Sequence, residues 1–233
     1  MPLDRPVWSA LSTRQGDQAL GGARALRLAP QFGVFGGTPD DATENLAALA
    51  DLVPAPGELW VVETKPFAPT PGLEVRRVAV CAQMVAAHPL AADPGFRFED
   101  LTEADAEQML ALATLTQPGP FYQATHRLGR FVGVKQDGRL VAMAGERLQP
   151  PGFTEVSGVC THPDHRGRGY AGRLMRVVSG RIVARGETPF LHAYASNAGA
   201  IGLYESLGFV TRCHMMLTVL EKISHPCPIA TRP

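Results

Sequence analysis

A stretch rich in glycine and arginine has the clearest chemical potential in the chain. It runs from Val159 to Gly172, and its sequence is VCTHPDHRGRGYAG. The pattern predicts a strand that ends near Thr161 and a helix that begins near Tyr170. Glycines let a backbone approach a ligand closely, and the amides at a helix N-terminus attract anions. The segment therefore predicts an anion site, with a solvated turn before an ordinary basic helix as the alternative.

Two motifs in this order and at this separation resemble the GNAT superfamily of N-acetyltransferases. Arg166-x-x-Gly169-x-Ala171 is similar to the family's acyl-CoA pyrophosphate loop, Q/R-x-x-G-x-G/A. Further along, Asn197-x-x-Ala200-x-x-x-Tyr204-x-x-x-Gly208-Phe209 is similar to the family's asparagine, helix and Y-x-x-x-G-F ending. The resemblance covers about residues 96–220. Within the superfamily, the segments that resemble the glycine N-acyltransferase-like branch are 118–121, 143–147 and 155–159.

The resemblance implies an acyl-CoA site made largely of backbone groups. In the family two parallel strands part, and the pantetheine arm pairs with one of them, here at Val159 and Thr161. The amides of residues 166–172 would hold the pyrophosphate, and Asn197 would hydrogen-bond the pantetheine. The set implied for the acyl-CoA is Val159, Thr161, Arg166, Gly167, Arg168, Gly169, Tyr170, Ala171, Gly172, Asn197, Ala200 and Tyr204. Acetyl-CoA is the implied co-substrate, with no metal.

Transfer of an acyl group from a thioester to an amine requires a base, an oxyanion donor and an acid. Glu155 is the first candidate for the base, because strand alternation predicts it on the face of Val159. Partial burial there would raise the pKa of Glu155 and let it act through a water. Glu146 on the neighbouring strand is the rival, and a solvent-facing Glu155 without a catalytic role is the alternative.

The other two catalytic roles fall to a backbone amide and a phenol. The N–H of Val159, near the end of its strand, is the expected oxyanion donor. Tyr204 matches the position of the family's usual general acid, since its hydroxyl can donate a proton to sulfur. Packing of Tyr204 against Ile201 and Leu207 is the alternative.

Several other residues invite a functional interpretation and receive a structural one. Cys160 with His162 lacks a third partner, so we expect Cys160 to be a small apolar residue rather than a nucleophile or metal ligand. Phe121 and Tyr122 could form the floor of an acceptor pocket or belong to a rigid turn. Trp60 is expected in the core of the N-terminal half.

Composition narrows the class of protein. Of 233 residues, 45% are apolar and 19% are charged, which is ordinary for a globular chain. Lysine and arginine number 22, as do aspartate and glutamate, so the net charge is zero and a general nucleic-acid binder is not expected. The apolar runs are too short to span a bilayer. The four cysteines are scattered, and no signal peptide is recognised, so a cytoplasmic protein is predicted.

The elements predict a mixed α/β fold. Residues 1–94 form an N-terminal α/β half, with strands at 25–28, 59–63 and 75–82, the last running into a helix through Met84 and Ala87. That half resembles a degenerate copy of the same fold. Residues 95–223 form the acyltransferase domain, and residues 224–233 form a tail. The elements of the acyltransferase domain are a strand at 96–98, a helix capped by Thr102 and Asp105, a meander at 131–161, a helix at 170–184, a strand at 190–194, a helix at 198–207 and a strand at 210–220.

Together these patterns predict a GNAT fold, a mostly antiparallel twisted sheet flanked by helices with one splayed parallel strand pair. The predicted function is transfer of an acetyl group from acetyl-CoA to a primary amine of a small molecule or amino acid, by direct attack in a ternary complex. An acetyltransferase of protein or peptide amines and a catalytically silent acyl-CoA-binding module are the alternatives. Acyl chain length and oligomeric state, a homodimer included, stay open.

Overall fold

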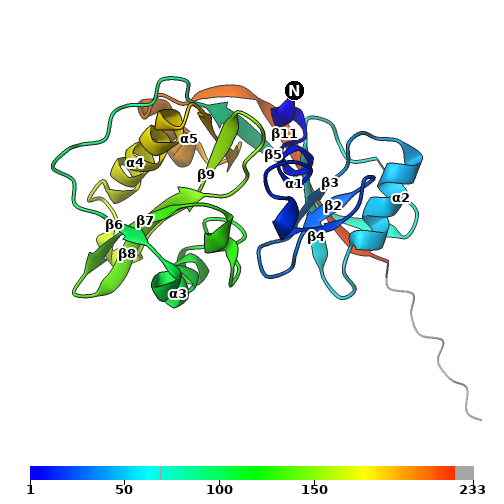
Figure 1. The fold of residues 1–233 in the computed structure, drawn as a ribbon, viewed down its shortest axis with the longest axis horizontal. Coiled ribbons are helices and arrows are strands. Elements are labelled where there is room, and N and C mark those ends of the chain that lie inside the picture. The colour runs from blue at the N-terminus through cyan, green and yellow to red at the C-terminus, as the bar shows by residue number, and fades with distance from the viewer. Residues whose placement is uncertain (69, 224–233) are drawn as a thin grey trace, which may run out of the picture.

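The computed structural model describes residues 1–68 and 70–223, and within these ranges eleven strands form one sheet. The strands are β1 (Ala19–Gly21), β2 (Leu26–Leu28), β3 (Phe35–Gly37), β4 (Glu58–Glu63), β5 (Leu73–Val85), β6 (Glu99–Leu101), β7 (Phe131–Gln136), β8 (Arg139–Glu146), β9 (Phe153–Thr161), β10 (Thr188–Tyr194) and β11 (Val210–Lys222). Their order in the sheet is β1-β2-β3-β4-β11-β5-β10-β9-β8-β7-β6 (Figure 1). The predicted tail, 224–233, lies outside the described residues.

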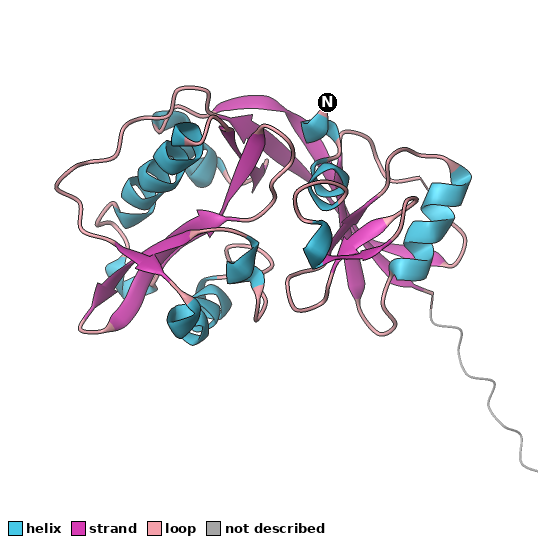
Figure 2. Cartoon of the chain, in the orientation of Figure 1, coloured by secondary structure: helices cyan, strands magenta, loops and turns pink. Residues whose placement is uncertain are grey.

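Helices cover both faces of this sheet (Figure 2). They are α1 (Pro6–Leu11), α2 (Thr43–Leu52), α3 (Ala106–Thr116), α4 (Tyr170–Ala184) and α5 (Ala198–Ser206). Alternation along β8 explains how one strand contacts two helices. Ala142 and Ala144 pack in the cluster with Leu174 of α4, whereas Met143 packs on the opposite face with Met109 of α3. No helix in the described ranges has the length and hydropathy to cross a bilayer.

Two long antiparallel strands, β5 and β11, connect the lobe of β1–β4 with the lobe of β6–β9 (Figure 1). β11 pairs with β4 on one side and with β5 on the other, and β5 in turn pairs with β10. A strand from the first 94 residues thus lies between two strands from the remainder. The sheet is continuous across the division predicted near residue 94, while the independence of the two parts stays a prediction.

β9 and β10 are parallel neighbours for only three residue pairs. Their register runs from Thr188↔Phe153 to Phe190↔Glu155, yet β9 continues to Thr161 and β10 to Tyr194. Beyond Phe190, β10 follows β5 as far as the pair Tyr194↔Cys81, so it leaves β9. The predicted mixed, mostly antiparallel sheet with a splayed parallel pair is therefore confirmed.

Most predicted elements are found, two predictions are wrong, and one helix was not predicted. In place of the helix expected through Met84 and Ala87, strand β5 continues to Val85, because pairing with both β10 and β11 outweighs local helix preference. The strand expected at 96–98 is β6, Glu99–Leu101, and Phe96 and Phe98 stack on each other instead. The unassigned first residues contain α1. The predicted capping box is present, since the amide of Thr102 donates to Asp105 Oδ2 at 2.9 Å.

Candidate active site

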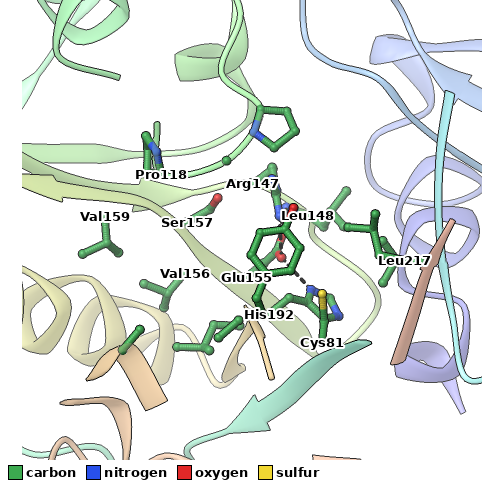
Figure 3. A pocket seen from close by; sticks show the side chains of 18 of the residues that line it. Cys81, Pro118, Arg147, Leu148, Glu155, Val156, Ser157, Val159, His192 and Leu217 are labelled. Carbon is green, nitrogen blue, oxygen red and sulfur yellow. Dashed lines mark hydrogen bonds and ion pairs between the residues drawn. The ribbon is translucent and has the colours of Figure 1, made fainter. Parts of the chain in front are cut away.

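A cavity of about 130 Å³ occupies the space between the diverging strands (Figure 3). Residues 155–159 of β9 and 191–194 of β10 form two of its walls, and three side chains of the α5 region form a third. The loop 118–120 lies over it. The remaining wall comes from Phe35, Trp60 and Val62 of the other lobe, with Cys81 of β5 and Leu217 of β11. The N-terminal half therefore closes the cavity that the splayed strands begin.

A β-bulge in β9 sets which side chains face this cavity. Met143 pairs with Cys160 and Gly145 with Ser157, so Ala144 faces two residues, Gly158 and Val159. Gly158 has φ of +62°, and a Cβ there would come within 2.8 Å of the Phe131 ring. The bulged residues have no register partner on β8, which leaves the amide of Val159 at an irregular point of the ladder.

The bulge overturns the alternation predicted for Glu155 and Val159. Val159 packs in the cluster of Val156 and Leu174, on the α4 side of the sheet. Glu155 precedes Val156 by one residue and points to the other face, toward Arg147 and His192. An extra residue inserted between them changes the period of two, so residues four apart no longer share a face.

Glu155 is a buried and fully hydrogen-bonded carboxylate. Arg147 Nε and Nη2 donate to its two oxygens at 2.8 Å each, and the amide of Leu148 lies 3.4 Å from Oε2. Burial alone would raise the pKa of Glu155, but the Arg147 guanidinium and the His192 ring outweigh burial and lower it to about 2. The expected raised pKa is wrong, because the carboxylate has acquired a charged partner that the sequence did not reveal.

A chain of hydrogen bonds fixes the ring of His192. Its Nδ1 lies 2.8 Å from Glu155 Oε1, and its Nε2 lies 3.1 Å from Nε2 of Gln83. The same Gln83 nitrogen donates to Leu3 O at 2.9 Å, and Gln83 Oε1 accepts from Arg212 at 2.7 Å. Gln83 is thus a donor toward His192. We assign the neutral tautomer with the proton on Nδ1, donated to Glu155.

Glu146, the rival candidate for the base, faces away from the cavity. Its Oε1 accepts from Arg185, just after α4, at 3.0 Å, and it is buried. Among the residues that line the cavity, Glu155 is the carboxylate and Glu146 is absent.

Tyr204 and Asn197 lie where the second motif predicts, on the cavity wall. Asn197 begins α5, and its side-chain oxygen accepts from the amide of Ala200 at 3.1 Å, which leaves its Nδ2 to donate. Burial raises the pKa of the Tyr204 hydroxyl above its usual value, so it is protonated at neutral pH. Its ring also packs near Phe209, at 6.4 Å between centroids. A packing role for the Tyr204 ring is therefore compatible with a position on the cavity wall.

The glycine-arginine segment forms an open helix N-terminus. Gly169 precedes α4 with φ of +74°, Gly167 has φ of +76°, and open space lies where a Cβ would extend from either. No side chain caps α4 among the described contacts, and the first helical amide with a backbone partner is Arg173, which donates to Gly169 O at 3.2 Å. Of the segment 166–172 predicted for pyrophosphate, the amide of Arg166 donates to Pro163 O at 3.2 Å, whereas the amides of residues 167–172 have no backbone partner among the described contacts and are available to an anion.

Most residues for which the sequence predicted a structural role have such a role. Cys160 is buried among Met143 and Leu140, and burial raises its pKa to about 11, so it is a neutral thiol. The described part of the chain shows no cluster of three residues suited to hold a metal. Phe121 packs edge-on against Phe131, and neither it nor Tyr122 lines the cavity.

Sequence reasoning missed the wall from the N-terminal half and the polar network around Glu155. Trp60 packs against a core cluster, as expected, but it also lines the cavity beside Phe35, at 5.9 Å between ring centroids. His192 and Arg147 also went unnoticed. A signal existed for His192, since its strand ends beside the predicted splay. None existed for Trp60, because only the pairing of β11 with β4 brings that strand to the site.

Comparisons with known proteins place this geometry among acetyltransferases. The family of FR47-like proteins matches residues 131–217. The N-alpha-acetyltransferase RimI of Mycobacterium tuberculosis (strain ATCC 25618 / H37Rv) is 38% identical over 82 residues, 34% of this chain and 51% of that protein, so the chain matches about half of the length of this relative. A crystal structure of a GNAT-family protein from Novosphingobium aromaticivorans DSM 12444 is similar over 96% of this chain and 100% of its own, with 48% identity and a TM-score of 0.88. A GCN5-related N-acetyltransferase from Kribbella flavida, at 16% identity and a TM-score of 0.60 over 94% and 96% of the two chains, shares the fold.

Proposed function

The chain belongs to the GNAT family of acetyltransferases, and from this premise we propose that it transfers an acetyl group from acetyl-CoA to a primary amine. The observation that carries the proposal is a juxtaposition. The uncapped N-terminus of α4 follows the end of β9, and the cavity lies where β9 parts from β10. A CoA whose diphosphate lies at the first site can extend its thioester into the second.

Backbone groups supply most of the proposed acetyl-CoA contacts. The segment 166–172 would bind the diphosphate through the amides of residues 167–172, with the open space over Gly167 and Gly169 leaving room for it. Val159 and Thr161 would pair with the pantetheine through their backbone, and Asn197 would donate to it from Nδ2. Ala200 and Tyr204 line the same cavity, so their side chains would lie beside the thioester end.

In the proposed reaction the amine nitrogen attacks the thioester carbonyl carbon directly, and the carbon–sulfur bond breaks. The amide of Val159, placed by the bulge, would stabilise the oxyanion. Tyr204 would donate its proton to the leaving sulfur. The new amide would release the amine's proton to water, from which Tyr204 would regain a proton. A protonated phenol in the cavity wall suits this task because it is a donor at neutral pH.

The geometry changes the role that we propose for Glu155. All of its hydrogen-bonding capacity is used by Arg147, His192 and the Leu148 amide, and its low pKa makes it a weak proton acceptor. We propose that Glu155 positions His192 and Arg147 in the wall. The amine would then enter the reaction as the neutral free base, without a carboxylate to deprotonate it.

The acceptor is proposed to be a small amine, because the cavity is enclosed by both lobes. A peptide amine is the second candidate, favoured by the 38% identity to a protein whose name is N-alpha-acetyltransferase. The glycine-conjugating branch is proposed only on the segments at 118–121, 143–147 and 155–159.

Release of free thiol tests the proposal. Purified protein with acetyl-CoA should release CoA thiol when small amines or N-terminal peptides are supplied, and mass spectrometry should show the acetylated product. Calorimetry measures CoA binding separately. CoA binding without thiol release across both classes of acceptor would favour the silent acyl-CoA-binding module, and no CoA binding would overturn both hypotheses.

A further inference from the structure

One wall of the cavity is neutral. It consists of Phe35, Trp60, Val62 and Cys81 from the N-terminal half, with Leu148 and Leu217 from the predicted acyltransferase domain. Burial raises the pKa of Cys81 to about 11, so this residue is also uncharged. Apart from Cys81, each of these residues has an aliphatic or aromatic side chain. An acceptor that lies against this wall therefore meets an apolar surface.

The two charges in the wall are already matched. Arg147 and Glu155 form a bidentate pair at 2.8 Å, and the Arg147 guanidinium lies 4.5 Å from the centroid of the Phe35 ring. A further ammonium brought inside would lose its hydration without gaining a free carboxylate, because both oxygens of Glu155 already accept hydrogen bonds. The interior thus discriminates against acceptors with a second ammonium group.

A positive charge lies over two aromatic rings that line the cavity. The Arg77 guanidinium lies 4.9 Å from the centroid of the Trp60 ring and 6.0 Å from that of the Tyr194 ring. Trp60 Nε1 donates to Glu58 at 2.7 Å, which holds the ring in place. A second ammonium group near these two rings would be repelled by Arg77, so diamines are disfavoured there as well.

The cavity volume sets an upper limit on the size of the acceptor. The cavity holds about 130 Å³, and an apolar cavity of roughly 150 Å³ accommodates one benzene ring. Because the thioester end of CoA is proposed to enter the same cavity, the buried part of an acceptor is at most about one ring or a short alkyl chain.

We propose that the wall around Phe35 and Trp60 is an acceptor subsite for primary monoamines with an apolar body no larger than this. This inference rests on the proposed acetyl transfer to an amine. It goes beyond it in naming the class of amine and in assigning Trp60 and Phe35, which lie outside the predicted acyltransferase domain, to acceptor selection.

Binding, measured apart from turnover, tests the subsite. Protein saturated with CoA is titrated with 2-phenylethylamine, pentylamine and 1,4-diaminobutane, of which the last two have similar lengths and differ in the charge of the far end. Calorimetry should show that pentylamine and 2-phenylethylamine bind about tenfold or more tightly than 1,4-diaminobutane, as expected for one uncompensated ammonium group. Equal or tighter binding of 1,4-diaminobutane, or no binding of any amine, would overturn the proposal.

A pair of tryptophan variants locates the subsite. Trp60→Ala should weaken the binding of pentylamine and 2-phenylethylamine several-fold and leave the Kd for CoA unchanged. The amine affinities of Trp60→Phe should lie between those of Trp60→Ala and the wild type. Trp8→Ala is the matched control, because Trp8 lies on α1 and does not line the cavity. An unchanged amine affinity in both Trp60 variants would place the acceptor elsewhere. Amine selectivity without thiol release from acetyl-CoA would leave the subsite intact and contradict only the proposed function.

Discussion

His192 Nδ1 lies 2.8 Å from Glu155 Oε1, across the point where β9 and β10 part. Phe190↔Glu155 is the last parallel pair in the register, and His192 is two residues further along β10. Backbone pairing between the two strands is thus succeeded by a side-chain hydrogen bond. Gln83 on β5 holds the other side of the ring, so one polar network links three neighbouring strands at the edge of the cavity.

Glu155→Gln should destabilise the fold at neutral pH, because it leaves the buried Arg147 guanidinium without its counter-charge. The cost of breaking such a pair is about 3 to 5 kcal/mol. The pKa of Glu155 is lowered to about 2, so the stability that the carboxylate adds is present above its unfolded value of 4.5 and is lost as the pH falls through about 2. Urea unfolding should therefore show a difference between the two proteins about 2 kcal/mol smaller at pH 3 than at pH 7.

A double variant distinguishes the loss of the whole ion pair from the cost of leaving one charge without its partner. Arg147→Met with Glu155→Leu removes both charges and keeps apolar volume, and it should be more stable than Glu155→Gln alone. Equal instability of the single and double variants at pH 7 would contradict the ion pair as the cause.

The acceptor's own ionisation should set the pH dependence of the reaction. If the amine reacts as the free base, kcat/KM rises tenfold per pH unit up to the pKa of the acceptor and then levels. Two amines of different basicity should therefore give profiles displaced by the difference between their pKa values. An inflection at the same pH for both amines, abolished in Glu155→Gln, would restore Glu155 as the base.

Tyr204→Phe should lower kcat about 100-fold, the usual size of a general-acid contribution. The Kd for CoA should stay the same, since only the hydroxyl is removed. Burial raises the pKa of Tyr204 above its usual value of 10, so the wild-type rate should not fall on the alkaline side until above that value. Tyr122→Phe is the control, because Tyr122 does not line the cavity. An unchanged kcat in Tyr204→Phe would leave this residue with its packing role beside Phe209 alone.

Two glycines of nearly equal conformation separate backbone strain from ligand binding. Gly169 and Gly138 have φ of +74° and +75°, and both have open space around the position of a Cβ. Glutamate at either site should cost about 1 to 2 kcal/mol of stability. Only Gly169→Glu places a negative charge beside the proposed diphosphate site, where about 2 kcal/mol, or roughly thirtyfold in the Kd for CoA, should be lost. Calorimetry that shows equal CoA affinity in both variants would place the diphosphate elsewhere.

The elements that the sequence predicted well are those with strong local patterns. The apolar period and the preceding glycines placed α4 at Tyr170–Ala184, and the Asp137-Gly138 turn placed the hairpin of β7 and β8. The two motifs led to the cavity wall at Asn197 and Tyr204 for the same reason, because each is a local arrangement of strand, turn and helix.

What the sequence could not reveal depends on contacts between distant segments. The bulge at Gly158 is decided by the close approach of Phe131, and it reverses the face that simple alternation assigns to Val159. The low pKa of Glu155 depends on Arg147 and on His192, which is 37 residues away. Trp60 reaches the cavity only because β11 crosses between the lobes. Pairings of this kind have no local pattern.

Glu63, at the end of β4, should make the fold less stable as the pH rises, in the opposite sense to Glu155. Burial raises the pKa of Glu63 to about 7, although Arg5 Nη1 lies 2.8 Å away and opposes the increase, and Asp41 adds to it. The folded chain therefore retains a proton that the unfolded chain loses near 4.5. The stabilisation that this proton gives the folded state is complete below about pH 4.5 and is lost as the pH rises through about 7.

Glu63→Gln keeps this position neutral at every pH, so the variant should gain on the wild type as the pH rises. Urea unfolding at pH 5 and pH 8 should show a relative gain of about 2 to 3 kcal/mol, because each tenfold change in proton affinity on folding corresponds to about 1.4 kcal/mol. Glu44→Gln on α2 is the control, because Glu44 is exposed and should give the same difference at both values. If the Glu63→Gln difference does not change between pH 5 and pH 8, Arg5 keeps Glu63 ionised throughout, and the ion pair outweighs burial.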